Sequence, residues 1–390
     1  MPLRPHQTTA LQAMTDYSKG QIIVPTGGGK TMCMIEDLKK QIEQADYRRI
    51  FVVVAPRILL ANQLSQEFLE QIDSVNVLHV HSGETHHTST TKSEIIKTFC
   101  IYPLHLHTII FTTYHSLHRV EESGIDVDTI YFDEAHNSVQ KNFIPATEHF
   151  SYNADRCYFF TATPKWSHSI KRIGMNNPQV YGNVICQVPA PKLVDDGFIL
   201  PPKVKLKQFD ILEDKEQVME RDCEHLIATI DDNDINKSLI CARSTKQIVR
   251  LFSESSFATD LWDRGYSWMY ITAKTGAVID GKKVDRETFF NILNEWGKTD
   301  KKFVVLHHSI LSEGINVKGL EAVLFMRNMD YIGISQSIGR VIRLGNSQKT
   351  FGLVCIPVYD KVGITTSRKV QAVVDTVFQK GEPAISIMRS

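Results

Sequence analysis

Short apolar runs, rich in β-branched residues, alternate with longer segments of helical spacing through the first 165 residues. This alternation is typical of βαβ units, in which parallel strands form a sheet and helices cover it. It predicts helices over residues 31–43 and 58–71. It predicts strands over residues 22–24, 50–55, 75–81, 108–112, 129–132 and 156–161.

A stretch rich in proline and glycine, residues 182–202, interrupts this rhythm and marks a domain boundary. Beyond it the alternation resumes, so we expect two α/β halves: residues 1–190, a linker at 191–202, and residues 203–390. In the second half, the pattern of apolar residues predicts helices over residues 245–253, 286–295 and 334–344. Its predicted strands cover residues 238–241, 267–271, 303–307, 322–325 and 351–356.

Length and charge change this picture little. A chain of 390 residues is too long for one ordinary core, which agrees with two domains. Lys and Arg total 44, as do Asp and Glu, so the formal net charge is zero. Any nucleic acid would therefore be held by a local basic groove, since the protein as a whole exerts no net attraction on a polyanion.

Seven cysteines occur without any CxxC spacing, which argues against structural zinc and against a disulfide framework. No apolar run reaches the roughly 18 residues of a membrane span, and the N-terminus does not resemble a signal peptide. We expect a soluble protein of a reducing, intracellular compartment: the cytoplasm of a bacterium or of a virus-infected cell, with the nucleus left open. The histidine-rich segment 79–94 offers a metal-site alternative, but we expect a solvated loop.

The sequence Pro25-Thr26-Gly27-Gly28-Gly29-Lys30-Thr31 follows the apolar run at residues 22–24. In a phosphate-binding loop, glycines turn backbone N–H groups toward the β-phosphate, a lysine bridges the β- and γ-phosphates, and a hydroxyl binds Mg²⁺. These tasks would fall to Gly27–Gly29, Lys30 and Thr31, so the stretch predicts ATP and Mg²⁺ as cofactors. Val24 stands where the full pattern has a glycine.

Asp133 and Glu134 follow the predicted strand at residues 129–132. A carboxylate at the end of a strand can hold Mg²⁺, and an adjacent glutamate can orient or deprotonate the attacking water. An acidic turn of no function is the alternative.

Gln336, Arg340 and Arg343 fall at i, i+4 and i+7 of a predicted helix, so their side chains share one face. Such a face is usually only solvated. Here, two arginines could instead supply positive charge to a phosphoryl-transfer transition state.

With these three motifs in this order, the chain resembles the superfamily 2 helicases and translocases of the DEAH-box kind over nearly its whole length. The resemblance implies an α/β fold of two tandem RecA-like lobes, each a parallel sheet flanked by helices, with the nucleotide in the cleft between them. It implies that Arg4 and Gln7, in Leu3-Arg4-Pro5-His6-Gln7, belong to the adenine-reading motif. It further implies that Thr161 and Thr163, with His136, couple hydrolysis to strand movement.

The same resemblance assigns residues in both halves. Gly314 and Asn316 would contact the nucleotide, although relatives often carry aspartate where this chain has Asn316. Backbone contacts to nucleic acid, without base reading, would come from Pro56, Arg57, Thr112, Thr113, Ser116, Ser244 and Lys246.

The linker sequence Asp-Gly-Phe-Ile-Leu-Pro-Pro at 196–202 resembles the junction in restriction-enzyme translocase subunits and phage branch-migration helicases, which act on DNA. DEAD-box RNA helicases have aspartate where this chain has His136. DNA is therefore favoured over RNA, and the compact two-lobe form favours a phage or viral source. A monomer is expected, with room for a stimulating protein partner.

These features predict an ATP-dependent helicase or translocase that remodels branched or duplex DNA. One alternative is the motor component of a restriction or defence complex whose nuclease lies on another chain. Another is an ATP-gated nucleic-acid clamp that does not step. Residues 317–335 leave no room for a strand-separating hairpin, and we interpret the other candidate insertion, residues 273–285, as a loop.

Overall fold

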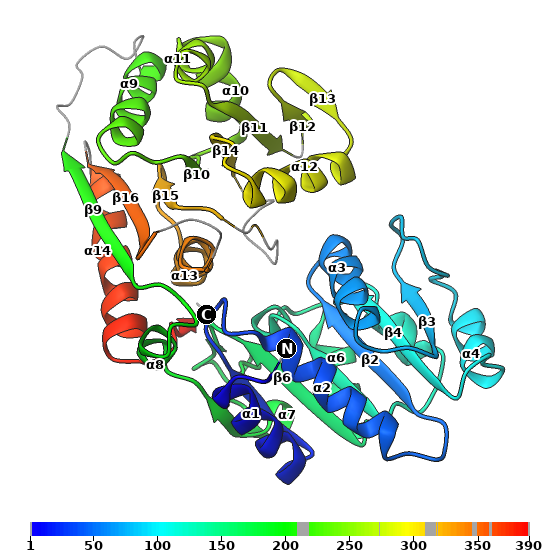
Figure 1. Cartoon of the computed structure of the whole chain (residues 1–390). Coiled ribbons are helices and arrows are strands. Elements are labelled where there is room, and N and C mark those ends of the chain that lie inside the picture. The colour runs from blue at the N-terminus through cyan, green and yellow to red at the C-terminus, as the bar shows by residue number, and fades with distance from the viewer. Residues whose placement is uncertain are drawn as a thin grey trace. The chain divides into compact units, whose positions relative to one another are not determined.

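The computed structural model describes residues 2–208, 218–272, 274–308, 317, 319–344, 349–358 and 361–388. The chain divides into two compact units: Met1–Val188 together with Ile385–Ser390, and Pro189–Ala384. Each unit contains a twisted sheet with helices packed against it (Figure 1). The predicted α/β fold class is confirmed: the sheet of the first unit is parallel, and the sheet of the second unit is parallel except at β12 and β13.

The sheet of the first unit has the strand order β3-β4-β2-β5-β6-β1-β8, and all its neighbours are parallel. Its central strands are continuous apolar runs because both of their faces are covered. The strands are β1 (Lys19–Ile23), β2 (Ile50–Ala55), β3 (Val75–Val80), β4 (His107–Thr113), β5 (Thr129–Phe132), β6 (Arg156–Thr161) and β8 (Val184–Gln187).

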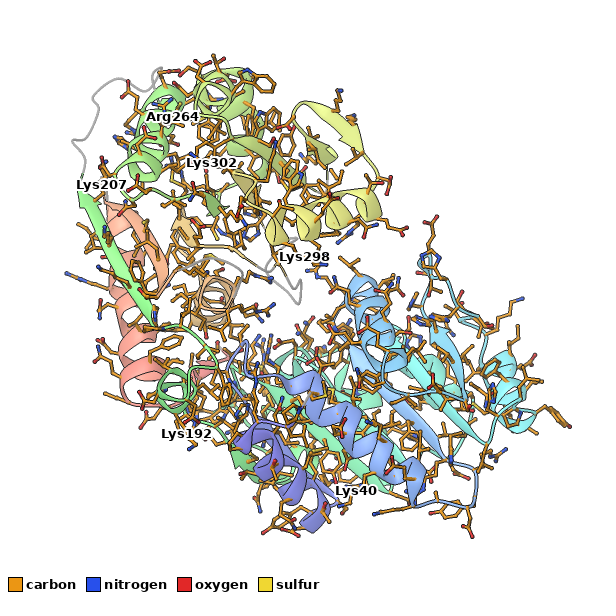
Figure 2. The ribbon with its side chains drawn as sticks, in the orientation of Figure 1. Lys40, Lys192, Lys207, Arg264, Lys298 and Lys302 are labelled. Atoms are coloured by element: carbon orange, nitrogen blue, oxygen red, sulfur yellow. The ribbon has the colours of Figure 1, made fainter. Side chains whose placement is uncertain are left out.

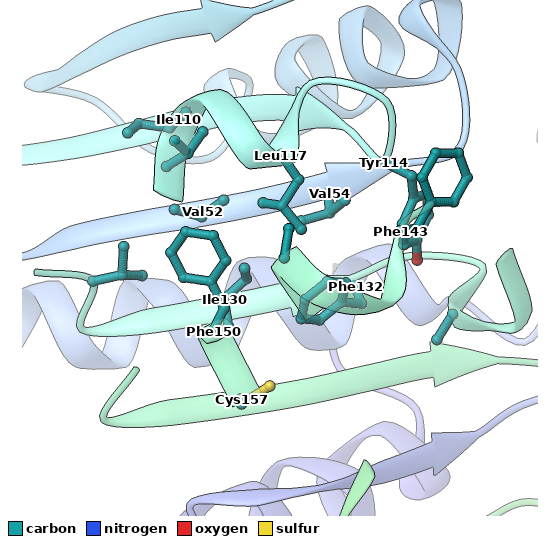
Figure 3. Packing of buried hydrophobic residues seen from close by; sticks show 14 of the residues in the cluster. Val52, Val54, Ile110, Tyr114, Leu117, Ile130, Phe132, Phe143, Phe150 and Cys157 are labelled. Atoms are coloured by element: carbon teal, nitrogen blue, oxygen red, sulfur yellow. The ribbon is translucent and has the colours of Figure 1, made fainter. Parts of the chain in front are cut away.

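Helices cover both faces of this sheet. They are α1 (Pro5–Asp16), α2 (Lys30–Glu43), α3 (Ile58–Leu69), α4 (Ser93–Ile101), α5 (Leu117–Glu122), α6 (Ile144–Asn153) and α7 (Pro178–Tyr181), with a 3₁₀ turn, η1, at Ala135–Asn137. Figure 3 shows one of the resulting cores, where Val52, Ile110 and Phe132 of the strands pack against Leu117 and Phe150 of the helices. This packing fixes the strand ends from which the candidate site is built.

Asp37 ties α2 to the sheet. Its carboxylate, 2% exposed, accepts hydrogen bonds from the Tyr131 hydroxyl at 2.7 Å and the Gln41 amide at 2.8 Å. It also pairs with Arg156 at 3.1 Å. A buried carboxylate is tolerated only when paired and hydrogen-bonded in this way. The network holds the helix that begins at Lys30 in a fixed place on β5 and β6.

The sheet of the second unit has the order β13-β12-β11-β14-β10-β15-β16-β9. Its strands are β9 (Pro202–Gln208), β10 (Lys237–Cys241), β11 (Ser267–Thr272), β12 (Gly276–Ile279), β13 (Lys282–Val284), β14 (Phe303–His307), β15 (Ala322–Phe325) and β16 (Gly352–Val358). The helices are α8 (Ala190–Asp195), α9 (Val218–Asp231), α10 (Thr245–Ser253), α11 (Phe257–Asp263), α12 (Arg286–Lys298), α13 (Tyr331–Val341) and α14 (Lys361–Val374), followed by a π-helical turn, η2 (Asp375–Gln379).

Residues 273–285 were expected to form a loop, and that expectation is wrong. β12 and β13 form an antiparallel hairpin that extends the sheet from β11. Asp280 and Gly281 make its turn with φ of 44° and 81°, the two positive values of a type I′ turn. The Asp280 carboxylate accepts a hydrogen bond from the Trp268 backbone N–H at 2.7 Å, which holds the tip of the hairpin against the sheet.

The other edge of this sheet is the strand β9, which carries Lys203, Lys205 and Lys207 at alternate positions. Lys207 projects from the strand and pairs with Asp232 (Figure 2). Lysines on an exposed edge strand discourage pairing with another chain. We therefore assign these cations to protection of the edge.

The end of the chain departs from the expected division at residues 203–390. β17 (Ser386–Ile387) belongs to the first unit and pairs with β7 (Lys165–Trp166). The backbone N–H of Ser386 donates to the Pro164 carbonyl at 3.0 Å. The chain therefore passes between the units twice. A two-residue strand gives no sequence pattern by which this return could be predicted.

The histidine-rich segment is not wholly a solvated loop, because His79 and His81 are 0% and 2% exposed at the end of β3. His79 Nδ1 lies 3.1 Å from His81 Nε2, and its Nε2 lies 3.1 Å from the Ser65 hydroxyl. Burial lowers the pKa of His79 to about 3 and also lowers that of His81. Among the described residues, no cluster of His, Cys, Asp and Glu is arranged to hold a metal.

Acidification from pH 7 to pH 5 is therefore expected to lower the free energy of unfolding. Below the ordinary histidine pKa of 6.5 the unfolded chain binds a proton that the folded His79 does not, so stability is lost as the pH falls. Each such histidine changes the free energy of unfolding by at most about 1.4 kcal/mol per pH unit. Urea unfolding should show a smaller acid-induced loss for His79→Gln than for the parent. Equal losses would contradict this assignment.

The part of the chain that the structure describes contains no helix long and apolar enough to cross a membrane.

Candidate nucleotide and nucleic-acid site

The glycine-rich stretch lies between the end of β1 and the start of α2. The Gly28 N–H donates to the Pro25 carbonyl at 2.9 Å, which closes the turn. Gly27 and Gly29 have φ of 88° and 84°, values that residues with a Cβ rarely adopt. α2 then begins at Lys30 and adds the positive end of its dipole. A glycine-rich turn that leads into a helix is the arrangement expected of a phosphate-binding loop, and Thr26 and Thr31 are partly exposed beside it.

Side chains from the N-cap and the first turn of α1 contact three consecutive carbonyls of this loop. Arg4 Nη1 donates to the Gly27 carbonyl at 3.3 Å, and Gln7 Nε2 donates to that of Gly29 at 3.2 Å. His6 Nε2 lies 2.7 Å from the Gly28 carbonyl. With the carbonyls engaged on one side, the loop is fixed for its N–H groups to meet an anion. The sequence predicted roles for Arg4 and Gln7, but it did not single out His6.

Gly29→Ala is expected to weaken nucleotide binding about tenfold, because the left-handed conformation costs ~1–2 kcal/mol with a Cβ present. The added Cβ would also lie 2.5 Å from Gln7 Nε2 and disturb the packing against α1. Fluorescent-nucleotide titration tests this. Gly124→Ala is the matched control, because Gly124 also has positive φ, at 63°, but a Cβ there meets nothing within 4 Å. Equal affinity in both variants would contradict the expectation.

The acidic pair lies at the end of β5, where the sequence predicted it. Glu134 has φ of 46°, an uncommon conformation for a residue with a Cβ and one that often marks functional sites. Its carboxylate pairs with the Lys30 ammonium at 3.5 Å. The Tyr114 hydroxyl donates to the Asp133 carbonyl at 2.8 Å and thereby fixes the turn. The ion pair of Lys30 with Glu134 thus joins the phosphate-binding loop to the acidic pair.

Asp133 is 6% exposed and lies next to a second carboxylate. Burial, with the charge of Glu134 as a smaller contribution, raises the pKa of Asp133 to about 7. The nearby Lys30 cation lowers it. Two adjacent buried carboxylates are the kind of oxygen ligands that a divalent cation prefers. Asp133 and the Thr31 hydroxyl are the groups suited to hold Mg²⁺.

The three residues expected to couple hydrolysis to movement lie together. His136 Nδ1 shares a hydrogen bond with the Thr161 hydroxyl at 3.0 Å. The Thr161 hydroxyl also accepts the Thr163 backbone N–H at 3.0 Å, and the Thr163 hydroxyl is 3.4 Å from His136 Nδ1. His136 Nδ1 is in turn 3.5 Å from Glu134 Oε2. The His136 ring thus lies between the Glu134 carboxylate and the strand end at Thr161.

The expected nucleic-acid contacts in the first unit differ in accessibility. Thr112 is fully buried and its hydroxyl donates to the Val80 carbonyl at 2.9 Å, so this side chain serves the sheet. Pro56 and Thr113 are also buried. Arg57 and Ser116 are partly exposed at the start of α3 and α5, respectively. Arg57 and Ser116 are the side chains of this group that solvent reaches.

In the second unit, Ser244 caps α10 by accepting the Gln247 backbone N–H at 3.0 Å, and Lys246 is exposed beside it. Gln336 and Arg340 lie on α13 and are 6% and 4% exposed. Arg343 was expected on the same helix, and that expectation is wrong. α13 ends at Val341, and Arg343 forms a β-bridge with Ile199. Gly314 and Asn316 lie outside the described residues.

Residues 1–166 match the model of the family described as "Type III restriction enzyme, res subunit". None of the curated proteins compared with the chain matches it.

Three solved structures are similar over essentially the whole chain. The ATP-dependent Type ISP restriction-modification enzyme LlaBIII bound to DNA aligns with TM-score 0.76 and 17% identity, covering 100% of this chain and 31% of that one. A nuclease-deletion mutant of the Type ISP enzyme LlaGI with a DNA substrate mimic gives 0.69 and 18%, covering 99% and 30%. A fragment assigned to the HsdR subunit of a type I restriction enzyme from Vibrio vulnificus YJ016 gives 0.61 and 18%, covering 98% and 67%.

At these identities the likeness establishes the fold, which the three structures share with this chain. The chain spans about a third of the length of the two Type ISP proteins.

Proposed function

We propose that this protein is an ATP-dependent DNA motor, a helicase or translocase of superfamily 2 related to the DEAH-box kind. The observation that carries the proposal is the ion pair between Lys30 of the glycine-rich turn and Glu134 of the acidic pair, at 3.5 Å. In this arrangement a lysine, a buried aspartate and a buried glutamate meet at the N-terminus of α2, as phosphoryl transfer requires. The match of residues 1–166 to the restriction-enzyme family supports the same class.

Different residues of the chain would bind the nucleotide, hold Mg²⁺ and activate the attacking water. The N–H groups of Gly27–Gly29 and the Lys30 ammonium would bind the phosphates, while Thr31 and Asp133 would hold Mg²⁺, which neutralises developing charge when bound. Glu134 would orient the attacking water and accept its proton. Arg340 and Arg343 would stabilise the transition state, with Gln336 beside them. Gly314 and Asn316 would complete the nucleotide contacts.

Movement along nucleic acid would follow from the link between Glu134, His136 and Thr161. We propose that a change at Glu134 on hydrolysis is passed through the His136 ring to the strand end at Thr161 and Thr163, at the sheet edge that also carries Arg57 and Ser116. With Ser244 and Lys246 in the second unit, these residues would contact the sugar–phosphate backbone without reading bases.

The role of motor in a restriction or defence complex is favoured by a specific observation. The three solved structures described above come from restriction enzymes, and two of them contain DNA or a DNA mimic. In this role the chain would translocate on DNA, and another domain or chain would cleave it. Strand separation is less well supported, because the β12–β13 hairpin is held against its own sheet by Asp280.

Glu134→Gln is expected to abolish steady-state ATP turnover while nucleotide affinity stays near that of the parent. Glutamine keeps the size of the side chain but cannot accept the proton of water. Rapid-quench hydrolysis and nucleotide titration on the same preparation measure the two quantities. Full turnover in this variant would exclude Glu134 as the base.

Displacement of streptavidin from end-biotinylated duplex DNA separates a motor from a clamp. A motor displaces the roadblock in the presence of ATP and loses this activity in Glu134→Gln. A clamp that does not step binds DNA in both nucleotide states and leaves streptavidin in place. Failure of displacement with intact DNA-dependent ATP hydrolysis would overturn the motor proposal in favour of the clamp.

A further inference from the structure

From residue 156 to residue 194 the sequence contains no aspartate or glutamate, although the chain as a whole has 44. One part of this stretch with several exposed residues is the segment 165–174, which we call the basic loop. It carries Lys165, His168, Lys171 and Arg172, and the last three are exposed. Lys165, Lys171 and Arg172 are the cations of this segment, which contains no acidic side chain of its own, on a protein whose net charge is zero.

The basic loop is held in one conformation by its ends. The Ser167 N–H donates to the Asn176 side-chain oxygen at 2.8 Å, and the Asn176 amide donates back to the Ser167 carbonyl at 2.8 Å. The Met175 N–H donates to the Lys165 carbonyl at 2.8 Å. A Cβ on Gly174 would lie 2.3 Å from the Ser167 nitrogen, so the two arms of the loop pass as closely as glycine allows. A ligand would find this surface already formed.

The middle of the basic loop carries one apolar side chain. Ile170 is fully exposed, at 106% of its reference area, between the polar residues Ser169 and Lys171. Trp166 is 36% exposed and is the register partner of Ile387, itself 56% exposed, in the β7–β17 pair. Partners in register lie on the same face of a sheet. Three exposed apolar side chains thus accompany the cations.

The position of the basic loop in the fold relates it to the proposed mechanism. It follows β6, whose last residue is Thr161, and Thr163 lies two residues before Lys165. The carboxyl ends of parallel strands meet at one edge of a sheet, so the loop leaves from the edge that also carries Arg57 and Ser116. A ligand on the loop would be connected by a few residues to the hydrogen bond between His136 and Thr161.

We propose that the basic loop is an additional nucleic-acid contact, in which Lys171 and Arg172 bind strand phosphates and Ile170 and Trp166 pack against bases. This inference rests on the proposed function and adds one contact to the surface along which the nucleic acid would bind. Cations beside exposed apolar or aromatic side chains are the combination that binds single strands without sequence preference. A protein partner would be expected to meet a surface with charges of both signs, and the basic loop has only positive ones.

The test compares Lys171→Ala/Arg172→Ala with Lys39→Ala/Lys40→Ala by anisotropy of labelled oligo(dT) and forked DNA at several salt concentrations. Lys39 and Lys40 are a consecutive pair in the C-terminal half of α2, which runs away from the carboxyl edge of the sheet (Figure 2 labels Lys40). The first variant is expected to bind about tenfold more weakly, with a salt slope lower by about 2, one for each phosphate that is no longer neutralised. Its ATP turnover without DNA should be unchanged.

Ile170→Ser examines the apolar contact separately. The side chain is fully exposed, so the substitution leaves the fold intact, and binding of oligo(dT) should weaken several-fold with the salt slope unchanged.

The outcomes separate the inference from the proposed function. If the parent binds DNA and Lys171→Ala/Arg172→Ala binds it equally well with the same salt slope, the inference is wrong and the motor proposal stands. That result would leave a protein partner as the occupant of the basic loop. If the parent binds neither DNA nor RNA, both are wrong.

Discussion

Lys30→Ala is expected to lower ATP turnover by a factor on the order of 10²–10³, the loss typical of removing one preorganised charge from a transition state. Lys30 begins α2, and its ammonium lies 3.5 Å from the Glu134 carboxylate. Because both side chains are largely buried, this charge acts in surroundings of low dielectric, where its effect is large. Alanine would remove the cation from the phosphates and also leave Glu134 without it.

Lys39→Ala serves as the control for this substitution. Lys39 lies on the same helix and forms a surface pair with Glu36 at 3.1 Å, a pair worth at most ~1 kcal/mol. Its turnover should equal that of the parent. Coupled-enzyme assays on both variants, with thermal melting to verify folding, provide the comparison. Lys30→Ala with parental turnover would mean that the glycine-rich turn does not bind the reacting phosphates.

Arg343→Ala is expected to reduce turnover by on the order of 10³–10⁵, the usual worth of an arginine that stabilises phosphoryl transfer, with nucleotide affinity largely retained. Arg343 suits the test better than Arg340, which is 4% exposed within α13 and whose loss would disturb packing. Arg343 follows the helix and bridges Ile199 through its backbone, which alanine preserves. The substitution therefore changes the side chain and leaves the bridge in place.

Arg250→Ala is the matched control in the same unit, since Arg250 forms a surface pair with Glu254 at 2.6 Å on α10. It should hydrolyse ATP like the parent. Single-turnover hydrolysis with excess enzyme separates chemistry from binding. If Arg343→Ala hydrolyses ATP at the parental rate, the assignment of transition-state charge to the second unit is wrong.

Local patterns predicted the glycine-rich turn before α2 and the acidic pair after β5 because the relevant residues are close together in sequence. Each of these features can be recognised within seven residues of sequence. They are glycines at positions of positive φ, a lysine at a helix start, and carboxylates after a buried strand. The contact of His6 with the Gly28 carbonyl has no such local sequence pattern, because it spans 22 positions and depends on how α1 packs on α2.

Other differences have physical causes that can be named. The Asp280-Gly281 pair is a hairpin signal that the expectation of a loop over residues 273–285 did not use. Helical spacing continues through Arg343, but the chain leaves the helix after Val341 to form the bridge with Ile199, a tertiary contact that overrides local preference. His79 was grouped with the polar residues that follow Val80, but it belongs to the predicted strand, and β3 directs it against Phe111 at 5.5 Å between ring centres.

Steady-state ATP turnover in the presence of different polymers tests the central claim most directly. The parent chain would be assayed alone and with single-stranded DNA, duplex DNA, forked DNA or RNA, using Lys30→Ala as the blank. We predict strong stimulation by duplex or forked DNA and none in Lys30→Ala. Stimulation by RNA alone would contradict a DNA motor, and turnover that no polymer changes would contradict a nucleic-acid motor of any kind.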